Sequence, residues 1–147
     1  MNITIKNTKI MESLSDETMC FTATGYVNGV KAFNVENRGH GGCNFYQAIN
    51  RPLYDKAVAF AMESRGINVK MDSLDYIIDD LVIDYQYSRD LKRLMKKVVM
   101  IEDGKAYTFK AVYTPEIGSF IQKKYPNGVI LNGLPFEEAL AKYRVCH

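Results

Sequence analysis

Two dipeptides, Asn28-Gly29 and Asp103-Gly104, limit what this chain can fold into. Each stands between two runs in which apolar and polar residues alternate, as they do along a β-strand with one buried face. Both residues of such a pair accept positive φ, which a type I′ turn requires. The sequence therefore predicts two antiparallel β-hairpins, one in each half of the chain.

The first hairpin carries an inconsistency that predicts a β-bulge. Counting outward from a tight two-residue turn places Phe21 and Phe33 on opposite faces. One extra residue restores a single apolar face, and Gly25 is the natural place for a bulge, since glycine within a strand often marks one. With a first strand that begins near Ile3, the hairpin predicts an antiparallel N-terminal β-meander of about three strands.

About four to five helices are expected from caps and from apolar periodicity. Serine and threonine accept hydrogen bonds at helix starts, and proline suits the first helical turn. Gly66 is expected to stop the first helix. The expected starts are Pro52, Ser73, Ser88, Thr114-Pro115 and Pro135. Hairpins that are segregated from helices predict an α+β fold, and we expect one compact domain over residues 1–147.

The composition is that of a packed globular chain. Its 147 residues are 47% hydrophobic and 24% charged, and a net charge of +2 names no partner by itself. The N-terminus lacks the apolar run of a signal peptide, and no run is long enough to cross a bilayer. We therefore expect a cytoplasmic protein without a membrane partner. The three cysteines, Cys20, Cys43 and Cys146, are widely spread, which indicates reduced thiols.

The stretch "VENRGHGGCNFYQ", residues 35–47, holds three of the ten glycines. A glycine turn at a strand exit is the simplest explanation. The backbone amides of such a turn can also form an anion-binding nest, although the spacing fits neither the P-loop nor the dinucleotide fingerprint. If the stretch binds a ligand, the predicted contacts are Arg38, Gly39, His40, Gly41, Gly42, Asn44 and Tyr46.

His40 and Cys43 are the alternative catalytic residues. An imidazole beside a thiol can lower the thiol pKa and produce a nucleophile, but a buried, inert cysteine is the simpler interpretation. Zinc is a weaker hypothesis, because the four residues of suitable type lack paired ligand spacing: His40, Cys43, Cys146 and His147.

A run of aspartates in the middle of the chain is followed by a run of lysines and arginines. Asp72, Asp75 and Asp79 share one helical face, which a solvated surface explains more simply than a divalent-metal site. We expect no metal ion and no cofactor.

Two further surfaces are predicted in this region. The helix expected to start at Ser73 has one apolar face for the core and a second apolar stripe on nearly the opposite side. That second stripe must be buried against a partner or remain exposed, so we predict an oligomer or partner surface at Tyr76, Ile83 and Tyr87. The second is a basic surface at Arg89, Lys92, Arg93 and Lys96. It could contact phosphates, but an ordinary charged helix exterior explains it as well.

Three stretches carry a resemblance. "MNITIKN", "VENRGHGGCNFY" and "GVILNGLPFEEALAKYR" are similar to segments of small uncharacterised proteins from bacteriophages and mobile elements. The resemblance covers the two ends better than the middle and carries no assigned activity or catalytic residue. It implies an accessory protein of the kind that binds or blocks a component of host defence, acting in the host cytoplasm.

The expected function is therefore that of a non-catalytic binding protein of the accessory type, with a counter-defence inhibitor as its expected form. Its partner would be a host protein or a small anionic, nucleotide-derived ligand, and it could form a homo-oligomer. Two alternatives remain open. One is a hydrolase or nuclease that acts on a phosphate substrate through His40, and the other is a nucleic-acid-binding protein.

Overall fold

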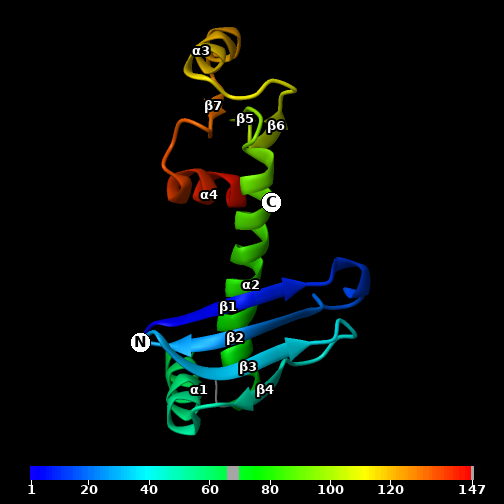
Figure 1. Cartoon of the computed structure of the whole chain (residues 1–147), viewed down its shortest axis with the longest axis vertical. Helices are drawn as coiled ribbons and strands as arrows, with labels where there is room; N and C mark the ends of the chain where they lie inside the picture. The colour runs from blue at the N-terminus through cyan, green and yellow to red at the C-terminus, as the bar shows by residue number, and fades with distance from the viewer. Residues whose placement is uncertain (66–69, 147) are drawn as a thin grey trace. The chain divides into compact units, whose positions relative to one another are not determined.

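Both predicted hairpin turns are present in the structure, a computed structural model that describes residues 1–65 and 70–146. The φ angles are 50° and 81° at Asn28 and Gly29, and 52° and 72° at Asp103 and Gly104. Positive φ at both positions is the signature of a type I′ turn. The chain has the α+β fold that the sequence predicts, with two antiparallel sheets and four α-helices among the described residues (Figure 1).

Contacts divide the chain into two compact units, Met1–Tyr85 and Gln86–His147. The border falls within the helix α2 (Lys70–Leu94). The division into two units does not test whether residues 1–147 form one domain, so the single domain stays a prediction.

The first unit is built on a four-stranded antiparallel sheet with the strand order β1-β2-β3-β4. A short 3-10 helix, η1 (Glu12–Leu14), follows the first strand, and α1 (Arg51–Arg65) follows the last. In Figure 1, α1 and the first part of α2 lie against the same face of this sheet. The strands are β1 (Ile3–Ile10), β2 (Phe21–Val27), β3 (Val30–Asn37) and β4 (Phe45–Ala48).

One face of the sheet and two helices form the core of the first unit. Alternate residues of β2 and β3 point to this face, so a single side of the sheet collects the apolar side chains. The buried members come from both strands and both helices: Phe21, Ala23, Phe33, Val35, Ala57, Ala61, Leu74, Ile78 and Val82. The opposite face of the sheet therefore carries the polar residues.

A register break occurs at the predicted point of the hairpin, but the bulge lies on the partner strand and not at Gly25. Gly25 pairs with Phe33, but Tyr26 pairs with Lys31, so the extra residue is Ala32 on the partner strand. The shift places Phe21 and Phe33 on the same buried face. A side chain at position 25 would collide with the Phe33 ring, which is why this position holds glycine.

The meander has four strands rather than about three. Residues 45–48 form β4, which pairs with β3 along Phe33–Glu36. The alternation in this strand is short and follows the glycine stretch directly, so periodicity alone did not separate it from a turn.

The helix α1 contains Pro52 in its first turn, as predicted. The predicted stop at Gly66 lies outside the described residues. The predicted caps at Ser73 and Ser88 are wrong, because both serines lie inside the continuous helix α2. Ser73 is fully buried. A serine cap contributes only about 1 kcal/mol, whereas burying Leu91 beyond Ser88 favours continuing the helix by about 1.5–3 kcal/mol.

The second unit holds a three-stranded sheet with the order β6-β5-β7. Successive residues of β5 face two different apolar clusters. Val99 packs with Leu91 and Tyr143, whereas Met100 packs with Ile121. The elements are β5 (Val99–Glu102), β6 (Lys105–Thr108), α3 (Pro115–Lys124), β7 (Val129–Ile130) and α4 (Phe136–Val145).

Local sequence signals determine where α3 and α4 begin. The Thr114 hydroxyl accepts a hydrogen bond from the amide of Ile117, and Pro115 follows as the first helical residue, as predicted. Pro135 stands immediately before α4. None of the described helices is both long and apolar enough to span a membrane.

Candidate binding surface on the four-stranded sheet

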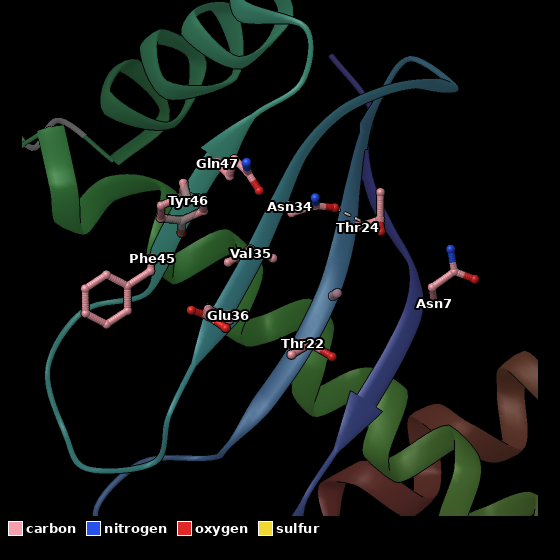
Figure 2. Close-up of a pocket in the computed structure, with 10 residues that line it drawn as sticks. Asn7, Thr22, Thr24, Asn34, Val35, Glu36, Phe45, Tyr46 and Gln47 are labelled. Atoms are coloured by element: carbon pink, nitrogen blue, oxygen red, sulfur yellow. Dashed lines mark hydrogen bonds between the residues drawn. The ribbon is translucent and has the colours of Figure 1, made fainter.

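The outer face of the sheet in the first unit is hollowed into an open depression of about 460 Å³. Figure 2 shows its side chains arranged over all four strands, with the Phe45 ring at the β4 rim. The lining mixes hydroxyl and carboxamide groups with apolar side chains, and consists of Asn7, Thr22, Ala23, Thr24, Asn34, Val35, Glu36, Phe45, Tyr46 and Gln47.

Strand pairing arranges these groups in rows across the sheet. Lys6 lies opposite Thr24, Thr24 opposite Asn34, and Asn34 opposite Gln47. The Thr24 hydroxyl donates to the Asn34 carboxamide oxygen over 3.4 Å, drawn as a dashed line in Figure 2. The neighbouring row runs from Lys9 through Thr22 and Glu36 to Phe45.

Positive charge and aromatic rings frame the depression. The ammonium of Lys6 lies 4.6 Å from the centre of the Tyr26 ring, and Lys31 is the cross-strand partner of Tyr26. At the other end, the guanidinium carbon of Arg38 lies 5.9 Å from the centre of the Phe45 ring, and Phe45 is 61% exposed. Phe45 therefore offers a ring face to solvent beside a cation.

Glu36 is the single carboxylate among the described residues that line the depression. It lies 3.8 Å from the guanidinium of Arg38, which is 75% exposed. Four basic residues lie on this face outside the lining itself: Lys6, Lys9, Lys31 and Arg38. Cations around a depression attract anions toward it.

The glycine stretch next to this face is held by the buried side chain of Asn37. Its carboxamide oxygen accepts hydrogen bonds from the amide of Gly39 (2.9 Å) and from the hydroxyl of Thr18 (2.6 Å). Its nitrogen donates to Asn44 Oδ1 over 3.0 Å. Gly39 needs its positive φ of 86°, and a Cβ there would collide with the Leu14 carbonyl oxygen.

Three backbone amides of the predicted anion nest already have acceptors within the protein. Gly39 donates to Asn37, and Gly41 donates to the Thr18 hydroxyl over 3.2 Å. The amide of Asn44 donates to the Asp75 carboxylate over 3.0 Å. The geometry therefore gives a structural reason for the glycines, as the simpler interpretation of this stretch predicts.

Asp75 and Asp79 on α2 anchor the far end of the stretch. Asn44 donates through its side chain to Asp79 over 2.9 Å, and Tyr46 donates its phenol proton to Asp75. Burial raises the pKa of Tyr46 far above its usual range, and the Asp75 carboxylate raises it further. The solvated face expected for these aspartates is therefore wrong for Asp75, which is half-buried and accepts two hydrogen bonds.

The alternative catalytic residues lie apart from the sheet depression. His40 is exposed. Cys43 is half-buried and lines a separate shallow depression with Asp75, Tyr76 and Asp79. In the described part of the chain, the cysteines are free thiols, and no cluster of three metal-ligating residues occurs. His147, a member of the weaker zinc hypothesis, lies outside the described residues.

The predicted partner stripe is divided between the two units. Tyr76 is 50% exposed, and Ile83 is half-buried at the edge of a cavity in the first unit. Tyr87 belongs to the second unit, where its ring packs edge-on against Tyr143 at 6.1 Å.

The predicted basic surface also lies in the second unit. Arg89 and Arg93 approach Asp90 at 3.9 and 3.6 Å, and the ammonium of Lys92 lies 5.2 Å from the centre of the Phe136 ring. Lys96 is exposed. Three of the four cations thus have neighbours on the protein itself.

Sequence reasoning missed most of the sheet depression. Of its lining residues, the predicted site contained only Tyr46, which points to the helices through its bond with Asp75. The alternating polar positions of β2 and β3 were a signal, because residues between buried apolar ones must share the opposite face.

In comparisons with protein-family models, curated proteins and solved structures, none matched this chain. The fold and the site thus define it only by class, as an α+β protein with an open, basic and aromatic sheet face.

Proposed function

We propose that this chain is a non-catalytic binding protein whose outer sheet face binds a nucleotide-type ligand, one that carries both a base and a phosphate. The observation that carries the proposal is the exposed Phe45 ring, with the Arg38 guanidinium beside it, at the rim of a depression rich in hydroxyl and amide groups.

Each part of this face matches a part of such a ligand. A base stacks on an exposed aromatic ring, and it gains about 1–3 kcal/mol from that contact. Lysine and arginine attract phosphate, and four of them lie on this face around the depression. Asn34 and Gln47 each hold a donor and an acceptor with which to bind base edges.

The resemblance of three stretches to phage and mobile-element accessory proteins supports a biological setting. In the host cytoplasm, the protein would sequester a nucleotide-derived signal of host defence and so act as a counter-defence inhibitor. Sequestration needs tight binding without turnover.

The test is isothermal titration calorimetry with three probes: a nucleoside monophosphate, a cyclic dinucleotide and a short single-stranded oligonucleotide. We expect the cyclic dinucleotide to bind more tightly than the monophosphate. Phe45→Ala should weaken binding by about 1–3 kcal/mol. Phe120→Ala is the matched control, because Phe120 is an exposed phenylalanine (70%) of the other unit.

Charge is tested in the same way. Lys6→Ala should weaken binding and reduce its dependence on salt, whereas Lys105→Ala in the other unit should change neither. Failure of all three probes to bind would overturn the proposal, and so would hydrolysis of a bound probe. Preference for the oligonucleotide would replace the signal-binding function with single-strand binding.

A further inference from the structure

A second cavity of the first unit lies beneath the glycine stretch, on the helix side of the sheet. Its volume is about 300 Å³, at the small end of the range for ligand sites. Residues of α2 and of the chain around β2 supply apolar walls: Met19, Phe21, Val82 and Ile83. The polar lining consists of Thr18, Asn37, Gly42, Asn44 and Asp79.

Most polar groups of this lining are committed to each other. The Asn37 oxygen accepts from Gly39 and Thr18, while its nitrogen donates to Asn44 and to the Gly42 carbonyl oxygen. The Thr18 hydroxyl also accepts from the amide of Gly41. A carboxamide has two donor hydrogens and an oxygen with two lone pairs, so Asn37 has no capacity left.

Asp79 is different, because its carboxylate retains capacity to accept hydrogen bonds. Asn44 donates to Oδ1 over 2.9 Å, and an ionised carboxylate has about four acceptor positions. Asp79 is exposed and also lines the shallow depression beside Cys43, which places its carboxylate at the mouth of the cavity.

The charge at this mouth is negative. Asp75 lines the adjoining depression, and none of the described residues that line either space is a lysine or an arginine. An anion would meet like charge there, whereas a cation would meet the free acceptor positions of Asp79. An apolar body would replace water along Met19, Phe21 and the α2 side chains.

We propose that this cavity binds a small organic ammonium compound, with its apolar body between Phe21 and Ile83 and its ammonium group on the Asp79 carboxylate. This site shares no charged residue with the outer sheet face. It therefore stands or falls independently of the proposed nucleotide-type ligand.

The test uses n-hexylammonium as the probe and n-hexanol as its neutral counterpart, in protein-observed NMR titrations of the full chain. We expect shifts at residues of the cavity wall and at least about tenfold tighter binding of the ammonium. Asp79→Asn should abolish that preference. Asp80→Asn is the matched control, because Asp80 is the next residue of α2 and does not line the cavity.

A second variant tests the apolar half of the site. Ile83→Trp would fill the cavity and should block both probes, while the circular dichroism spectrum shows that the variant folds. The proposal is overturned if hexylammonium does not bind, if hexanol binds as tightly, or if Asp79→Asn keeps the preference. Loss of hexylammonium binding together with intact nucleotide binding would remove this site alone.

Discussion

Tyr46 on β4 donates its phenol proton to the carboxylate of Asp75 on α2, and the same carboxylate accepts the backbone amide of Asn44. This contact joins the edge strand of the sheet to the helix that covers it. Tyr46→Phe should therefore lower the free energy of unfolding by about 1–3 kcal/mol, because the half-buried Asp75 carboxylate loses the hydrogen bond from the phenol. Urea unfolding measures the change. An unchanged midpoint would mean that the bond contributes nothing.

The same tyrosine predicts a dependence of stability on alkaline pH. Burial raises the pKa of Tyr46 in the folded protein, whereas in the unfolded chain it is about 10. The unfolded state thus loses the proton first, and stability should fall as the pH rises above about 10. Thermal unfolding of Tyr46→Phe across this range should show a shallower decline than the wild type. Equal slopes would contradict the raised pKa.

Gly25 and Phe33 predict a coupled pair. A methyl group at position 25 would collide with the buried Phe33 ring, so Gly25→Ala should destabilise the protein by about 1–3 kcal/mol. In a double-mutant cycle, Phe33→Leu should cost less in the Gly25→Ala background than in the wild type. Additive losses would show that the ring does not set the cost.

Gly39 and Gly42 form a matched pair within the glycine stretch. Both have positive φ, 86° and 83°, so an alanine at either position is strained by about 1–2 kcal/mol. A Cβ at Gly39 would also meet the Leu14 carbonyl oxygen, whereas a Cβ at Gly42 has open space around it. Gly39→Ala should therefore be the more destabilising variant in chemical denaturation. Equal losses would leave backbone strain as the whole effect.

Replacing Asp79 should not destabilise the protein, unlike the substitutions described above. Burial raises the pKa of Asp79 above its usual range, although the hydrogen bond from Asn44 opposes the shift. The folded state thus disfavours the charged form, and Asp79→Asn should leave stability at neutral pH unchanged or higher, by less than about 1 kcal/mol. The difference from the wild type should shrink as the pH is lowered, because protonation of the wild-type carboxylate removes the disfavoured charge. Thermal unfolding from neutral to acid pH checks this, and a less stable Asp79→Asn variant at neutral pH would refute it.

Features determined by neighbouring residues were predictable from the sequence. The Asn28-Gly29 and Asp103-Gly104 turns, the Thr114 cap and the α+β class follow from backbone preferences that act over a few residues. A register break in the first hairpin was predictable too, because its two apolar patterns must share a face, but its bulge falls on Ala32 rather than on Gly25.

Only the tertiary structure decided the features that depend on distant partners. Asn44 meets Asp75 and Asp79, residues more than thirty positions along the chain, and no local periodicity encodes such a meeting. Serine is a favoured residue for a helix start, yet α2 continues through Ser88. Burial of Leu91 contributes more free energy than a serine cap does. The sheet face that we propose as the binding surface exists only when four strands bring their polar positions together. Turns are local and cost little to specify, whereas a site requires long-range packing that the sequence pattern alone does not define.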